Sequence, residues 1–240
     1  MRGSLALVGS GEYLPAMAEF EKSLIKDGEA NGHRPRYIQI PTAAGQESAE
    51  RIDFWKELGA TQAEHLDAEQ VFLPIYSRED AFNPEFVEKI AGSALVYMSG
   101  GDPHHLSQTL IDTPVWQAIL KNWHEGGSLA GCSAGAMVMS SHIPNFRFTK
   151  KPPTQGLEII DGIRVIPHFN KFFKWIPDSA AKVLLHAPDG TILLGIDELT
   201  ALVQRTGTTS WKVQGEQLVH IVSGLPQAQF KDGDELTLTL

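Results

Sequence analysis

The chain has 240 residues and a formal net charge of −9 at pH 7, with no basic run longer than Lys150-Lys151. This length suits one large α/β domain, expected to span residues 1–240, and the acidic balance argues against nucleic acid or an anionic membrane as a partner. Because Cys132 is the only cysteine, no intrachain disulfide can form.

An apolar run opens the chain at residues 5–8 and ends at Gly9. It is too short for the core of a signal peptide or for a membrane span, so a cytoplasmic protein is expected. The oligomeric state is not defined by the sequence, which leaves a homodimer open.

Strand and helix patterns alternate along the first 140 residues. Short apolar runs predict strands at residues 4–8, 36–40, 94–98 and 128–130, with a weaker candidate at 62–66. Helices are expected from Pro15, over residues 47–58 and 86–90, after Asp102-Pro103, and from Thr113-Pro114 to about residue 125. The fold class is therefore α/β, a three-layer sandwich whose mostly parallel sheet carries helices on both faces.

The pattern changes after residue 141. Residues 142–155 contain three prolines and no clear period, which predicts a surface loop. A strand is expected at 161–166 and a helix at 172–185, broken or restarted at Pro177. Short strands are predicted at 192–196, 201–204, 210–213 and 217–221, and an edge strand at 235–240.

The run Gly131-x-Ser133-x-Gly135 has the pattern of a nucleophile elbow. A sharp strand-to-helix turn lifts the serine hydroxyl clear of the sheet, and crowding in that turn requires small flanking residues. The backbone N–H of Ala134, at the start of the helix expected over residues 134–140, then faces a developing oxyanion. The pattern indicates acyl-transfer chemistry on Ser133.

A serine nucleophile also needs oxyanion donors, a base and an orienting acid. Gly100-Gly101 follows a strand and allows close backbone approach, although an ordinary strand–helix turn has the same composition. His168, at the end of a predicted strand, is the best base candidate among nine histidines. Asp197 and Glu198 are both candidate acids, and a solvated acidic turn is equally consistent with them. No metal-binding spacing occurs, so no metal or other cofactor is expected.

Three alternatives stay open at this point. Cys132 would be the nucleophile of a cysteine enzyme, but the glycines flank position 133 and favour the serine. An α/β-hydrolase esterase would use the order serine, acid, histidine, with His220 as the base. A non-catalytic binding protein would keep the fold without the reaction.

Five short segments occur in an order that resembles the cyanophycinase and dipeptidase E (aspartyl dipeptidase) family of serine peptidases. They are Ile40-Pro41-Thr42-Ala43, Gly100-Gly101-Asp102, Gly131-Cys132-Ser133-Ala134-Gly135-Ala136, His168-Phe169 and Gly195-Ile196-Asp197-Glu198-Leu199-Thr200-Ala201. The resemblance implies a class I glutamine amidotransferase-like fold with serine in place of cysteine. It also implies hydrolysis of a peptide or isopeptide bond through an acyl-enzyme.

The resemblance assigns a role to each site residue. It implies Ser133 as nucleophile, His168 as general base and Glu198 as the orienting acid. The backbone N–H groups of Gly101 and Ala134 would form the oxyanion hole. Contact with a small peptide or isopeptide substrate is expected from Gly100, Asp102 and Phe169.

The segments around His168 depart from the cyanophycinase pattern. Ile166-Pro167 replaces Asp-Gln, Pro103 replaces a glutamine, and Lys171 and Lys174 stand where cyanophycinases have arginines. These changes argue against cyanophycin as the substrate. The basic residues near the site are expected to be mostly solvated, although they could contact an acidic substrate; they are Arg147, Lys150, Lys151, Lys171 and Lys174.

Overall fold

The computed structural model describes residues 1–144, 154–175 and 190–239. An eight-stranded sheet forms its centre in the order β14-β11-β10-β1-β5-β4-β2-β3. The strands β1 (Leu5–Val8), β5 (Ser128–Cys132), β4 (Ser93–Met98), β2 (Arg34–Ile40) and β3 (Glu69–Phe72) are parallel. Strands β10 (Thr200–Gln204), β11 (Trp211–Gly215) and β14 (Glu235–Leu236) extend the sheet in antiparallel fashion. This confirms the expected large, mostly parallel central sheet.

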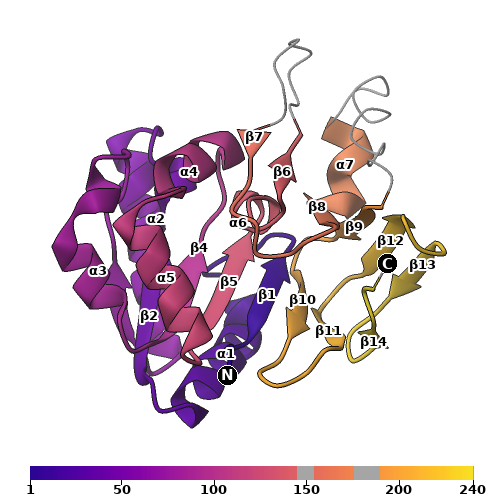
Figure 1. The fold of residues 1–240 in the computed structure, drawn as a ribbon, viewed down its shortest axis with the longest axis horizontal. Coiled ribbons are helices and arrows are strands. Elements are labelled where there is room, and N and C mark those ends of the chain that lie inside the picture. Colours follow the sequence, from indigo (N-terminus) through magenta and orange to yellow (C-terminus); the bar gives the residue numbers. More distant parts are fainter. Residues whose placement is uncertain (145–153, 176–189, 240) are drawn as a thin grey trace.

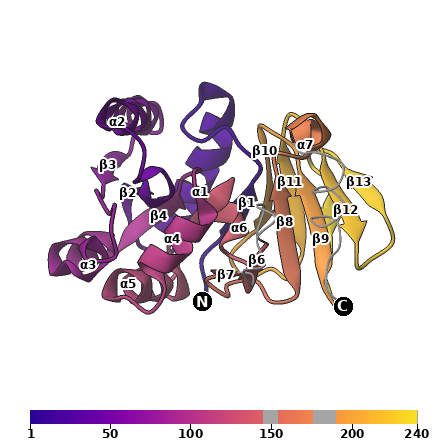
Figure 2. The ribbon, with the colours of Figure 1, turned by 90° about the horizontal axis from the view of Figure 1, so that it is seen from above.

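Helices cover both faces of this sheet, as Figure 2 shows from above. The first face carries α1 (Ala18–Ala30), after the 3-10 turn η1 (Pro15–Met17), and α2 (Ala49–His65), after η2 (Thr42–Ala44). The opposite face carries α3 (Pro84–Ile90), after η3 (Asp80–Phe82), with α4 (Pro103–Leu110), α5 (Pro114–His124) and α6 (Ala134–Met137). The expected start signals are confirmed, because Asp102 caps α4 and Thr113 caps α5, each followed by proline.

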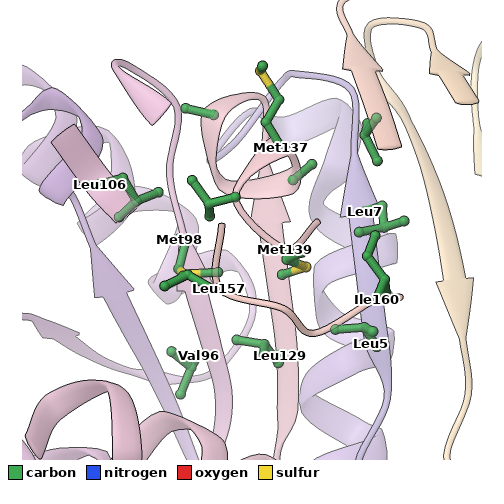
Figure 3. Packing of buried hydrophobic residues seen from close by; sticks show 14 of the residues in the cluster. Leu5, Leu7, Val96, Met98, Leu106, Leu129, Met137, Met139, Leu157 and Ile160 are labelled. Atoms are coloured by element: carbon green, nitrogen blue, oxygen red, sulfur yellow. The ribbon is translucent and has the colours of Figure 1, made fainter. Parts of the chain in front are cut away.

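The core beneath α4 and α6 is apolar and closely packed (Figure 3). Side chains from three parallel strands meet Leu106 of α4, Met137 of α6 and the segment with Leu157 and Ile160. The contributing strand residues are Leu5, Leu7, Val96, Met98 and Leu129, all at most 2 % exposed. Water is therefore excluded directly below the strand-to-helix turn at Ser133.

A second sheet lies on the C-terminal side of the molecule and was not predicted (Figure 1). Its order is β13-β12-β9-β8, with β8 (Ile163–Pro167) parallel to β9 (Ile192–Ile196). Strands β12 (Val219–Ser223) and β13 (Ala228–Phe230) follow in antiparallel fashion. The helix α7 (Phe169–Trp175) follows β8. The turn after β9 leads directly into β10 of the central sheet.

The prediction around α2 was wrong in two respects. The helix does not end at Gly59, and residues 62–66 are helical or follow the helix instead of forming a strand. A Cβ on Gly59 would lie 2.3 Å from the Gln39 side chain, and Gln39 Nε2 donates to the Gly59 carbonyl at 2.8 Å. Gly59 is thus a site of close helix–sheet packing, so it does not mark a helix end.

Other boundaries differ by a few residues. Helix α6 ends at Met137, earlier than expected, and α7 begins at Phe169, three residues before the predicted start. The short strands β6 (His142–Ile143) and β7 (Thr154–Gln155) occupy the ends of the predicted loop, whose residues 145–153 lie outside the described part, as do residues 176–189. In the described ranges, no helix is both long enough and apolar enough to cross a membrane.

Candidate active site

Ser133 occupies the sharp turn between β5 and α6. Its backbone has φ +51° and ψ −109°, a strained conformation for a residue with a side chain. A Cβ on Gly131 would lie 2.3 Å from the Gly135 carbonyl oxygen, and a Cβ on Gly135 would lie 2.3 Å from the Met98 carbonyl oxygen. Both flanking positions therefore require glycine, as expected for a nucleophile elbow.

The hydroxyl of Ser133 meets the imidazole of His168. The distance from Ser133 Oγ to His168 Nε2 is 2.8 Å, although 35 residues separate the two in sequence. His168 directly follows β8 and has φ +119°, a second strained backbone position. A serine on the central sheet and a histidine on the second sheet thus share one hydrogen bond.

Glu198 lies on the far side of the His168 ring. Its Oε1 is 3.2 Å from His168 Nδ1, and its Oε2 forms an ion pair with Lys171 of α7. Partial burial opposes ionisation of Glu198, but the contacts with Lys171 and His168 outweigh it and hold its pKa below the usual value. An ionised carboxylate at Nδ1 favours the imidazole tautomer that carries its proton on Nδ1, in which Nε2 is a hydrogen-bond acceptor facing Ser133 Oγ.

Asp197 and His220 form a second, separate pair. His220 Nε2 is 3.1 Å from Asp197 Oδ1, and Asp197 Oδ2 accepts the Leu218 N–H at 3.2 Å. Asp197 is only 4 % exposed. Of the two adjacent carboxylates, Glu198 therefore meets the histidine at Ser133, while Asp197 links the β9–β10 turn to β12. His220 is not the histidine that the structure brings to the serine.

Two backbone N–H groups close to Ser133 in sequence or fold have no hydrogen-bond acceptor among the described residues. They belong to Gly101, in the turn after β4, and to Ala134, the first residue of α6. Gly101 has φ +137°, and a Cβ there would lie 2.3 Å from the Ala43 carbonyl oxygen. Only glycine fits this turn.

Glu12, which follows β1, is a site residue that the sequence reasoning missed. Its Oε1 accepts the Gly100 N–H at 2.7 Å, and its Oε2 accepts the Cys132 thiol proton at 2.9 Å. Glu12 is 8 % exposed, so these contacts lie in a largely water-free environment. One carboxylate therefore ties the glycine turn to the residue before Ser133. The available signal was an acidic residue in the Gly-Ser-Gly-Glu run after a buried strand.

The thiol of Cys132 is fully buried below the elbow. Burial raises its pKa well above the usual value, and the neighbouring Glu12 carboxylate adds to this effect. A protonated, inaccessible thiol is a poor nucleophile. The geometry thus agrees with the preference for serine over cysteine at this turn.

The three residues expected to contact the substrate have different surroundings, and only Gly100 faces Ser133. Gly100 faces the serine, because a Cβ there would lie 3.2 Å from Ser133 Cβ, while Asp102 Oδ1 accepts the His104 and His105 N–H groups as a helix cap. The Phe169 ring packs over Gly195 and lies 4.7 Å from the His220 ring, centroid to centroid. Phe169 thus contacts the second sheet.

A cavity of about 500 Å³ opens beside the histidine and the glutamate. The β1–α1 loop, α2 and the β9–β10 turn form its walls. Of the basic residues considered in the sequence, Lys171 is paired with Glu198. Arg147, Lys150 and Lys151, and the side chain of Lys174, lie outside the part of the chain that the structure describes. No cluster of three potential metal ligands occurs within that part.

A serine at a strand–elbow–helix turn, within hydrogen-bond distance of a histidine that contacts a carboxylate, is an arrangement typical of serine hydrolases. The comparison with known families narrows this class. The model of peptidase family S51 matches residues 5–211, and the chain belongs to this family.

The relatives include cyanophycinases and solved peptidase structures. The cyanophycinase of a Nostoc species is 32 % identical over 208 residues, which cover 80 % of this chain and 64 % of the cyanophycinase. The chain thus matches just under two thirds of the length of that relative. A crystal structure of a peptidase from an acI-B1 Actinobacterium is 63 % identical, covers 99 % of this chain and 98 % of its own, and superposes with a TM-score of 0.97.

A third neighbour shares the fold at low identity. A putative peptidase E from Listeria monocytogenes is 18 % identical and superposes with a TM-score of 0.64 over 90 % of this chain and 100 % of its own. The expected family and fold class are confirmed by these comparisons.

Proposed function

We propose that the chain is a serine peptidase that hydrolyses a peptide or isopeptide bond, with Ser133 as nucleophile, His168 as general acid–base and Glu198 as the orienting acid. One observation carries the proposal: the contacts of 2.8 Å and 3.2 Å that join the three side chains in series at an elbow turn. The family match supports it, because family S51 is a family of peptidases.

The reaction begins when Ser133 Oγ attacks the scissile carbonyl carbon and His168 Nε2 takes the hydroxyl proton. The new C–O bond yields a tetrahedral oxyanion. When the C–N bond breaks, His168 gives that proton to the leaving nitrogen, and an ester to Ser133 remains. Water then attacks the ester while His168 takes its proton. Collapse of the second oxyanion releases the acid and returns the proton to Ser133.

The Gly101 and Ala134 N–H groups are the proposed donors to both oxyanions. They belong to different segments, so their spacing depends on how the glycine turn sits beside the elbow. Glu12 controls that spacing in this proposal, because it holds Gly100 and Cys132, the residues that directly precede Gly101 and Ser133 in each segment. Glu12 is thus a positioning residue, which contacts the neighbours of Gly101 and Ser133 and not the reacting atoms.

A fluorophosphonate probe tests the proposal without knowledge of the substrate, because an activated serine hydroxyl displaces its fluoride and forms a stable covalent bond to phosphorus. We expect stoichiometric labelling, found by mass spectrometry on Ser133 and lost in Ser133→Ala. His168→Gln should lower the labelling rate by several orders of magnitude. The matched control is His220→Gln, which alters the other histidine–carboxylate pair and should label at close to the wild-type rate.

Two results would count against the proposal. A folded wild-type chain that takes up no probe would favour a non-catalytic binding protein. Dependence of labelling on His220 with no dependence on His168 would favour the serine–acid–histidine order of an α/β-hydrolase esterase.

A further inference from the structure

The cavity beside His168 has a wall that is unusually apolar for an exposed surface. Helix α2 contributes Phe54, Trp55 and Leu58, and the facing loop contributes Leu14. The Phe54 and Trp55 rings lie 5.5 Å apart, centroid to centroid, in an edge-to-face arrangement. A cavity of about 500 Å³ is within the range of small-ligand sites.

Two of its wall residues are among the few large apolar side chains that the described structure leaves exposed. Phe54 is 47 % exposed and Leu14 is 39 % exposed, and both line the same cavity. Isolated exposed apolar residues need no explanation, but a group of them next to proposed catalytic residues indicates a surface that becomes covered during binding.

The charged groups of the cavity do not favour a charged ligand side chain. Arg51 lies over the Phe54 and Trp55 rings at 5.1 Å and 4.9 Å and is paired with Glu47. The two carboxylates in the lining, Glu12 and Glu198, are both held by the contacts described above. An acidic side chain would face these carboxylates, and a basic one would face Arg51.

The position of the cavity indicates which part of the substrate it receives. His168 and Glu198 belong to the lining, whereas Ser133 and the proposed oxyanion donors Gly101 and Ala134 do not. In the proposed mechanism His168 must reach the leaving nitrogen, so the leaving-group residue lies on the histidine side of the scissile bond.

Resting on the proposed function, we infer that this cavity binds the side chain of the leaving-group residue and selects an aromatic or large aliphatic one. The substrate class is thus a peptide or isopeptide whose residue after the scissile bond is apolar. Peptides with an acidic or basic residue at that position should be poorer substrates.

Cleavage of a peptide panel tests the inference. Every peptide in the panel carries Phe, Leu, Gly, Asp or Lys as the leaving residue, after the scissile bond. The residue before the scissile bond is varied as well, and aspartate is included there in both α- and β-linkage. We expect kcat/KM for Phe and Leu to exceed that for Gly, Asp and Lys by about 10- to 100-fold. Phe54→Ser should reduce this advantage by about tenfold.

Phe82→Ser is the matched control, since Phe82 is also exposed, at 51 %, and also lies beneath an arginine, Arg78, but outside the cavity. It should leave the selectivity unchanged. The inference would be overturned by preference for Asp or Lys, by selectivity that Phe54→Ser leaves intact, or by a labelled enzyme that cleaves none of the panel. Dimerisation abolished by Phe54→Ser, without a change in selectivity, would also overturn it. A wild-type chain that takes up no probe would instead refute the proposed function, and this inference with it.

Discussion

Replacing Glu12 by alanine removes the acceptor for two donors at once. The Gly100 N–H would lose a charge-assisted bond of 2.7 Å, and the buried Cys132 thiol would lose its partner at 2.9 Å. An unsatisfied buried donor costs about 1–3 kcal/mol, and a thiol is a weaker donor than an amide, so the two losses together should lower the unfolding free energy by roughly 2–4 kcal/mol. This loss is measurable by urea denaturation.

The catalytic consequence is larger in the proposed mechanism. When the glycine turn relaxes, the Gly101 N–H no longer points at the oxyanion, and loss of one such donor lowers rates by about 10²–10³-fold. Because the phosphonyl oxygen occupies the same hole, the second-order rate of phosphonate labelling should fall by that factor in Glu12→Ala.

Two further variants separate positioning from folding. In Glu12→Gln the amide oxygen still accepts the Gly100 N–H, so labelling should fall by less than about tenfold. Cys132→Ala removes only the thiol contact and should label within about threefold of wild type. If Glu12→Ala lowers stability as expected but labels at close to the wild-type rate, Glu12 is a purely structural residue and the reasoning fails.

Other predictions concern buried groups and glycines. Burial raises the pKa of Glu21 from 4.5 to about 8, so the folded state retains a proton that the unfolded state releases, and stability should fall between about pH 4.5 and 8. At about 1.4 kcal/mol per pKa unit, the loss of unfolding free energy amounts to roughly 5 kcal/mol. Glu21→Gln should remove this dependence of unfolding free energy on pH, measured by denaturation at several pH values across that range. Gly131→Ala should prevent folding or lower the unfolding free energy by more than about 3 kcal/mol, because the new Cβ meets the Gly135 backbone. Gly92→Ala is the control: Gly92 has φ +70° but open space around it, so the loss should be only about 1–2 kcal/mol. Thermal denaturation measures both. Iodoacetamide should leave the native Cys132 unmodified, and rapid alkylation accompanied by loss of phosphonate labelling would contradict its assignment as an inert residue.

The sequence predicted the parts of the site that depend on local geometry. The elbow at Ser133 and the caps at Asp102 and Thr113 each need particular residue types within a few positions, so a single sequence contains the signal. Gly59 was misread because a helix–sheet contact with Gln39, distant in sequence, decides its conformation. The local sequence pattern around Gly59 contains no signal for such a contact.

The choice between Asp197 and Glu198 illustrates the same limit. Adjacent side chains at a strand end point in different directions, so the residues alone left both open, and only the family resemblance favoured Glu198. The structure brings one carboxylate to each of two histidines. Glu12 was missed because its contacts span 88 and 120 residues along the chain, and they depend on the order of β1, β5 and β4 in the sheet.

The three proposed catalytic side chains come from two different sheets and the turn between them. Ser133 follows β5 of the central sheet, His168 follows β8 of the second sheet, and Glu198 lies where the chain passes from one sheet to the other. The distance between Ser133 and His168 therefore reports how the two sheets are docked. In the proposed mechanism, we expect a substitution at the interface between the two sheets to change that distance and, with it, the reactivity of Ser133. The rate at which a phosphonate labels Ser133 would therefore also report how the two sheets pack against each other.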